Sequence, residues 1–70
     1  MIKKKITGII ASKEYRESSD NYKLKIITSD KQEFFFYSQQ RHRETIKEIT
    51  VNEKYLFTVF KGRKYWFLEN

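Results

Sequence analysis

A chain of 70 residues is long enough for a single small domain, which we assign to residues 1–70. It contains no cysteine and one histidine, His42, so the sequence offers neither a disulfide nor a cluster of thiolates or imidazoles for a metal ion. Fifteen Lys and Arg residues against nine Asp and Glu residues give a formal net charge of +6, which favours polyanionic partners, nucleic acid ahead of an anionic membrane. No apolar run is long enough for a membrane span, so the composition predicts a cytoplasmic protein that does not act at a membrane.

The first half of the chain alternates in the manner of β-strands. Residues 2–15 form a long, isoleucine-rich predicted strand that Gly8 interrupts, and a lone glycine in a strand indicates a bulge or a sharp bend. Residues 16–21 are polar and predict a loop. Residues 22–28 place apolar side chains on one face and lysines on the other, which predicts a second strand, and residues 29–32 predict a hairpin turn.

The second half changes period once. Residues 33–37 predict a third strand that is almost wholly aromatic. Residues 39–50 lack turn residues and place Ile46 and Ile49 three apart, with His42 four before Ile46, which predicts a short amphipathic helix with Ser38 as its N-cap. Residues 54–61 and 64–68 predict a fourth and a fifth strand, joined by a tight turn around the second of the two glycines.

Five strands with one helix between the third and the fourth is the element order of the OB-fold. In this order, over its full length, the chain resembles OB-fold single-stranded nucleic-acid-binding proteins; the glycine-interrupted first strand and the helix at residues 39–50 are the matching features. The resemblance implies an all-β fold, a small five-stranded OB-type Greek-key barrel with one short helix between strands 3 and 4. It also implies a ligand surface on the outer face of the second and third strands, flanked by the first and last hairpin loops.

Four consecutive aromatic residues, at positions 34–37, form the third predicted strand. Successive side chains of a strand point to opposite faces, so about two of these rings must face outward. By analogy with the third strand of OB barrels, we expect Phe34 and Phe36 to point inward and Phe35 and Tyr37 outward. Exposed rings beside Lys23 and Lys25 of the second strand would form a stacking platform next to a phosphate track. The alternative is that a helix or a dimer partner covers the outer pair.

Two loops add further candidates. The last hairpin has a basic tip, and alternation from Lys64 predicts that Trp66 points outward while Tyr65 and Phe67 point inward. At the first loop, the side chains of Tyr15 and Arg16 could close over a ligand from the other side. The predicted nucleic-acid-binding residues are therefore Tyr15, Arg16, Lys23, Lys25, Phe35, Tyr37, Lys61, Arg63, Lys64 and Trp66. For His42 the sequence favours a structural position, covering the end of the barrel beside Ile46.

No arrangement of residues in the sequence suggests catalysis, since one histidine and no cysteine cannot supply the usual nucleophile and base pairs, and no phosphate-binding glycine loop is present. We expect no enzymatic activity, no cofactor and no metal. The leading hypothesis is a binder of single-stranded nucleic acid, with DNA favoured and RNA as the other candidate. The rival is a protein-interaction module, an OB or SH3-like barrel whose aromatic face serves a homodimer or a protein partner in replication or mobile-element function.

Overall fold

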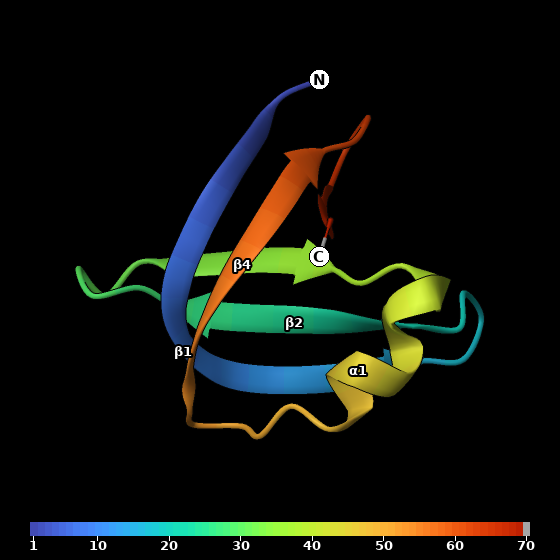
Figure 1. The fold of residues 1–70 in the computed structure, drawn as a ribbon, viewed down its shortest axis with the longest axis horizontal. Coiled ribbons are helices and arrows are strands. Elements are labelled where there is room, and N and C mark those ends of the chain that lie inside the picture. Colours follow the sequence, from blue (N-terminus) through green and yellow to red (C-terminus); the bar gives the residue numbers. More distant parts are fainter. Residues whose placement is uncertain (70) are drawn as a thin grey trace.

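The strands close into a barrel in the computed structural model, which describes residues 1–69 (Figure 1). The five strands are β1 (Lys3–Arg16), β2 (Asn21–Ile27), β3 (Glu33–Tyr37), β4 (Lys54–Lys61) and β5 (Trp66–Leu68). They pair around the barrel in the order β1-β2-β3-β5-β4, and β4 closes on β1. All pairs are antiparallel except β3 with β5, which is parallel. The predicted all-β class, with five strands and a short helix between the third and fourth, is confirmed.

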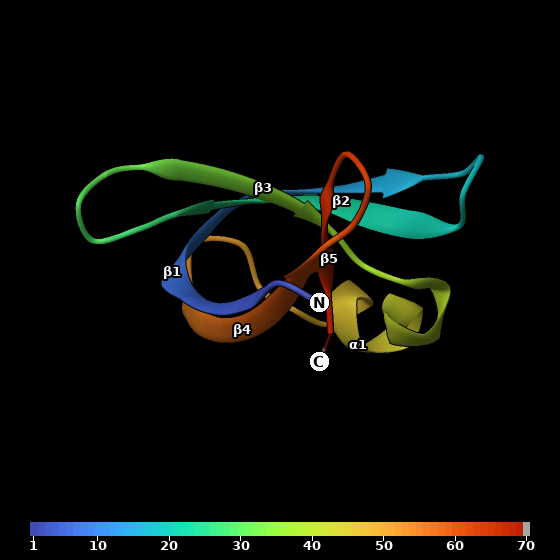
Figure 2. The same ribbon diagram turned by 90° about the horizontal axis from the view of Figure 1, so that it is seen from above.

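Strand β1 bends so strongly that it serves both layers of the barrel. Its first half pairs with β4 and its second half with β2, and Figure 2 shows it crossing from one layer to the other. The bulge lies at Ala11, where the register with β2 shifts between Ile10 and Ser12. Of the two alternatives predicted from Gly8, the bulge lies elsewhere, whereas the bend of β1 is observed. Gly8 instead lets the backbone of β1 approach the backbone of β2 closely, because a Cβ at this position would lie 2.4 Å from the backbone oxygen of Ile27.

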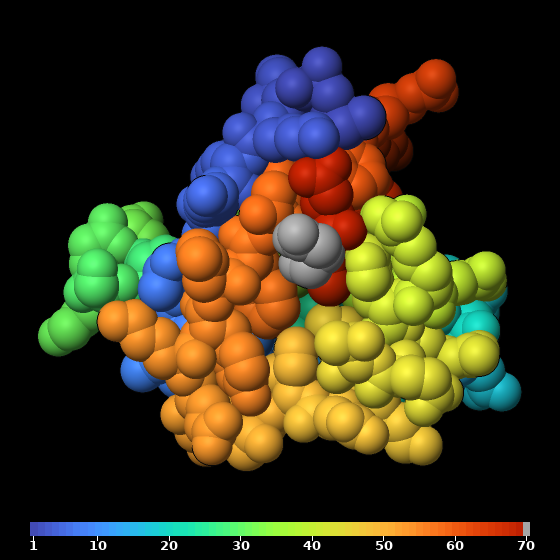
Figure 3. All heavy atoms as spheres, in the orientation of Figure 1, coloured from blue at the N-terminus to red at the C-terminus, as the bar shows by residue number. Residues whose placement is uncertain are grey.

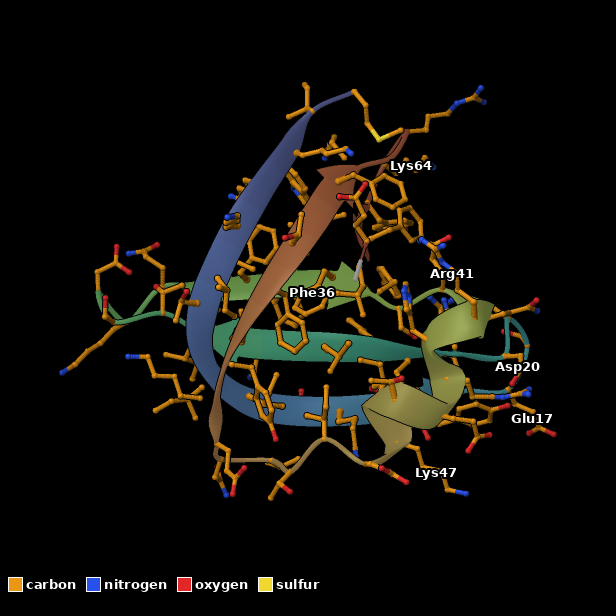
Figure 4. All side chains as sticks on the ribbon, viewed as in Figure 1. Glu17, Asp20, Phe36, Arg41, Lys47 and Lys64 are labelled. Atoms are coloured by element: carbon orange, nitrogen blue, oxygen red, sulfur yellow. The ribbon has the colours of Figure 1, made fainter. Side chains whose placement is uncertain are left out.

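The barrel interior is filled by side chains from every strand and from the helix. At its centre Phe36 is fully buried, and its ring centroid lies 5.2 Å from that of Phe57 on β4 (Figure 4). Ile46, also fully buried, reaches in from the helix and closes one end. Such a continuous apolar core is what a domain of this size requires, because burial of apolar area is its main source of stability.

The helical segment is shorter than predicted. It consists of a 3₁₀ turn, η1 (Gln40–His42), followed by α1 (Arg43–Lys47), where the sequence predicted a helix over residues 39–50. Ser38 is not its N-cap: the buried Ser38 hydroxyl accepts a hydrogen bond from the Tyr22 amide at 2.9 Å and so extends the pairing of β3 with β2. Neither helical segment within residues 1–69 has the length and apolar character of a membrane span.

A lysine from β1 satisfies the carboxyl end of this short helix. The Nζ of Lys13 donates to the carbonyl oxygens of Ile46, Lys47 and Ile49 at 3.2, 2.8 and 2.7 Å. The last carbonyls of a helix have no partner within the helix, and a cation at that end also complements the helix dipole. Lys13, a residue of strand β1, therefore ties the helix to the barrel.

Candidate nucleic-acid interface

The aromatic strand β3 divides its rings between two faces. Phe36 is 0% exposed and Phe34 packs against the core, whereas Phe35 is 46% exposed on the outer face. The predicted inward and outward alternation of these three residues is confirmed. It follows from the register, since Phe36 lies opposite buried Leu24 and Phe35 lies opposite Lys25 on β2.

Two ammonium groups flank the exposed ring of Phe35. The Nζ of Lys23 lies 5.0 Å from the ring centroid and that of Lys25 lies 6.0 Å from it. These are cation–π distances, which place both ammonium groups over the ring. The outer face of β2 and β3 thus presents an apolar ring with positive charge next to it.

Tyr37 also lies on the outer face but is not an exposed ring. It is only 9% exposed, because Tyr65 packs edge-on at 5.0 Å, Phe67 lies 6.1 Å away, and the Arg16 guanidinium lies 4.9 Å from its ring centroid. The expectation that Tyr37 would be open to a ligand was wrong. The covering rings come from the end of the chain, where β5 pairs with β3 through Tyr37 and Phe67.

The orientation predicted for the last strand is reversed. Trp66 faces inward and packs against Phe34 with ring centroids 5.7 Å apart, whereas Phe67 faces outward against Tyr37 and Phe60. The cause is the length of the turn: Gly62 donates its amide hydrogen to the Tyr65 carbonyl oxygen at 2.7 Å, so the strand begins at Trp66 and not at Lys64. Because Lys64 lies in the turn and not in the strand, the inward and outward alternation of β5 cannot be counted from it.

Tyr65 is the surface ring that the sequence analysis missed. It is 52% exposed and rests on Tyr37, at the opposite end of the outer face of β3 from the β2–β3 turn. It lies in the turn because β5 begins two residues later than predicted, at Trp66 and not at Lys64. We use the name platform for the outer-face residues Arg16, Lys23, Lys25, Phe35, Tyr37 and Tyr65.

The other predicted residues lie apart from the platform. Tyr15 pairs with Tyr22 on the inner side of the sheet, and its hydroxyl donates to Asp20, which also binds Arg43. This hydrogen bond to Asp20 is the main cause of a raised pKa of the Tyr15 hydroxyl. Figure 4 shows Asp20 beside the helix, so the first loop is closed onto the helical segment and not over the platform.

The basic tip of the last hairpin is split in the same way. The Nζ of Lys61 lies 5.6 Å from the ring centroid of Trp66, on the inner side of the barrel wall. Arg63 and Lys64 are exposed in the turn that leads to Tyr65, and Figure 4 shows Lys64 at the edge of the molecule. Both residues directly precede Tyr65 of the platform in the chain.

Two depressions lie beside the β2–β3 turn. The larger, of about 450 Å³, runs between β1 and the β2–β3 turn and is lined by basic and acidic side chains together, among them Lys4, Lys5, Asp30 and Glu33. Figure 3 shows this turn projecting from the body of the molecule. Within residues 1–69 no three His, Cys, Asp or Glu side chains are grouped as a metal site would need.

Comparison with known proteins returned no match, whether to a family model, to a curated protein or to a solved structure.

Proposed function

We propose that this protein binds single-stranded nucleic acid through the platform. The observation that carries the proposal is the ring of Phe35, nearly half exposed between the ammonium groups of Lys23 and Lys25. The exposed ring leaves apolar area in contact with water, and stacking of a base would cover its free face. The strand order is also compatible with an OB-like barrel, whose outer face at the second and third strands serves this purpose by fold-level analogy.

Each group on the platform then has a definite role. Bases stack on Phe35 and Tyr65, and each stacked base contributes about 1–3 kcal/mol. The cations of Lys23, Lys25 and Arg16 neutralise phosphates, which makes the affinity fall as salt is added. Tyr37 contacts no base in this scheme; it supports Tyr65 and Arg16 from beneath. Single-stranded DNA is the first ligand to test and RNA the second.

The test is fluorescence anisotropy with a labelled thymidine oligonucleotide, a uridine oligonucleotide and a duplex of equal length, each titrated over a range of salt. We expect the single strands to bind more tightly than the duplex, with affinity falling as salt rises. Phe35→Ala should lower single-strand affinity roughly tenfold, the loss of one stacked base. Leu56→Ala is the matched control, because Leu56 is a comparably exposed apolar side chain on the outer face of β4.

Equal loss in the two variants, or equal affinity of wild-type protein for single strand and duplex, would contradict the proposal. Sedimentation addresses the rival function directly. A stable dimer that dissociates when Phe35 is replaced would make the platform a protein-interaction surface instead.

A further inference from the structure

Glu33 places a carboxylate on the same face as the platform. It is the first residue of β3 and lies two positions before Phe35, so both side chains leave the strand on its outer side. Its side chain is 56% exposed, and its Oε1 lies 4.0 Å from the Nζ of Lys25. A negative charge beside a phosphate track weakens phosphate binding, which makes its position next to the stacking ring notable in a protein of net charge +6.

Lys25 connects this carboxylate with the ring. It is the cross-strand partner of Phe35, its Nζ lies 6.0 Å from the Phe35 ring centroid, and the same Nζ reaches Glu33. At 4.0 Å the two charged groups are close but not in hydrogen-bond contact. An ammonium donor near the ring and a carboxylate acceptor therefore lie 4.0 Å apart, each with hydrogen-bonding capacity left over.

The spacing along the strand suits the edge of a stacked base. Two residues of a strand span about 6.6 Å, so the Cα atoms of Glu33 and Phe35 are about one base width apart. Bases that stack on aromatic side chains in single-stranded complexes expose their Watson–Crick edges, and side chains at the rim of the ring read those edges by hydrogen bonds.

We propose that Glu33 and Lys25 together read the base stacked on Phe35 and select guanine; this inference rests on the proposed function. The Watson–Crick edge of guanine carries one acceptor, O6, followed by two donors, N1–H and N2–H. The ammonium group of Lys25 donates to O6, and the two oxygens of Glu33 accept from N1–H and N2–H. All three polar groups of the guanine edge are then satisfied by this one pair of side chains.

The other bases match the pair less well. Cytosine and adenine each present one amino donor to the carboxylate and one neighbouring acceptor to the ammonium group, so one carboxylate oxygen is left without a partner. Thymine and uracil are the poorest ligands, since their single N3–H lies between two carbonyl oxygens, one of which faces the carboxylate. The expected order is guanine first, cytosine and adenine next, and thymine and uracil last.

The experiment uses thymidine oligonucleotides of one length that differ only in a single central base. Because the flanks are uniform, the strand can slide until the preferred base lies on Phe35. For wild-type protein we expect the oligonucleotide with one guanine to bind roughly five- to tenfold more tightly than the all-thymidine strand, the lower end of what a bidentate base contact contributes, since Glu33 is exposed.

Glu33→Gln should reduce that ratio to within about twofold and should leave affinity for the all-thymidine strand unchanged or higher, because the amide accepts at one atom only and removes a negative charge. Glu48→Gln is the control for charge alone, since Glu48 is exposed at the end of the helix. It should shift all affinities together and preserve the guanine preference.

A wild-type ratio near one, or a ratio that survives Glu33→Gln, overturns the base-reading role of Glu33. In that case Phe35→Ala still decides the proposed function separately, because loss of binding to the all-thymidine strand depends on stacking and not on base identity. If wild-type protein shows no preference for single strands over duplex, both proposals fail together.

Discussion

The two faces of β3 set chemically alike residues in opposite environments. Phe36 and Phe35 are neighbours in the chain, yet Phe36 is fully buried against Phe57 while Phe35 is open to solvent between two lysines. Both residues are phenylalanines, so the difference in their exposure comes from the strand geometry and from the residues that the neighbouring strands place opposite each ring. A run of aromatic residues in a small barrel therefore contains both a core and a surface, and only the register separates them.

The outer face itself is not uniform along β3. Around Phe35 it is open, whereas around Tyr37 it carries a second aromatic cluster in which Tyr65, Phe67 and Phe60 pack together across β3, β5 and β4. Gly62 allows this packing, since a Cβ there would lie 2.6 Å from the Phe67 ring. The aromatic cluster around Tyr37 fixes the position of the exposed ring of Tyr65. A ring that is already held in place loses less conformational entropy when a ligand binds.

The largest effect that separates the two faces is on stability. Phe36→Ala should lower the free energy of unfolding by about 3–5 kcal/mol, since it removes a fully buried ring from the centre of the core. Domains of this size have little more stability than that, so the variant should be largely unfolded. Urea unfolding followed by circular dichroism measures the effect. Phe35→Ala is the control on the other face and should cost less than about 1 kcal/mol; equal costs would mean that the faces are not distinct.

The next largest effect should come from Tyr37, which belongs to the outer face but is buried. Tyr37→Ala should cost about 1–3 kcal/mol of stability and should also weaken single-strand binding, because Tyr65 and Arg16 lose their support. Tyr37→Phe keeps the ring and should preserve both properties. Unfolding curves and anisotropy on the same samples give the two values. Weakened binding with unchanged stability would instead place Tyr37 in direct contact with the ligand.

Local alternation was sufficient to predict which residues of β2 and which of Phe34, Phe35 and Phe36 face the core. The Leu24 and Ile26 face of β2 and the inward side of β3 follow the period of two, and their neighbours in the sheet are near in the chain. Strand β1 does not follow it throughout, because Ile9 is 47% exposed and the register shifts after Ile10. The helix was predicted in the right place but too long, because its ends depend on Ser38 pairing with β2 and on Lys13 binding its last carbonyls. Neither contact leaves a signal in the helix sequence.

The part of the candidate site that could be predicted is built mainly from β2 and β3, with Arg16 at the end of β1. Lys23, Lys25 and Phe35 lie together because a short hairpin joins their strands, so register follows from alternation. The covering of Tyr37 could not be foreseen, since Phe67 and Tyr65 reach it through a parallel contact with a strand of three residues. A strand so short takes its register from the preceding turn, and the turn was longer than the sequence indicated.

A smaller effect should distinguish the platform from the outer face of β1 and β4, which also carries lysines. Lys23→Gln with Lys25→Gln removes two charges beside Phe35, whereas Lys5→Gln with Lys54→Gln removes two exposed charges from the other side of the barrel. If each platform lysine neutralises one phosphate, the slope of log affinity against log salt should become shallower by about 1.4 in the first variant. The second should change it by much less. Equal changes would reduce binding to net charge alone.

The smallest expected effect is a pH dependence of stability that originates in the helical segment, at His42. The pKa of His42 lies below its ordinary value, chiefly because burial disfavours the charged imidazole and also because Arg41 is close; hydrogen bonding to the backbone of Glu69 opposes the shift in part. Its Nδ1 is buried and has no hydrogen-bond partner among residues 1–69, so a proton there would have no acceptor.

As the pH falls below about 6.5, the unfolded chain binds a proton at His42 before the folded protein does, so the free energy of unfolding must decrease. The loss continues until the pH passes the folded pKa, and it should be absent in His42→Gln. Urea midpoints of both proteins above and below this pH measure it. The outer face should not share this response: affinity for a single strand should change with pH equally in wild-type and His42→Gln protein. If His42→Gln protein kept the wild-type dependence of stability on pH, the pKa of His42 would be the same in the folded protein as in the unfolded chain.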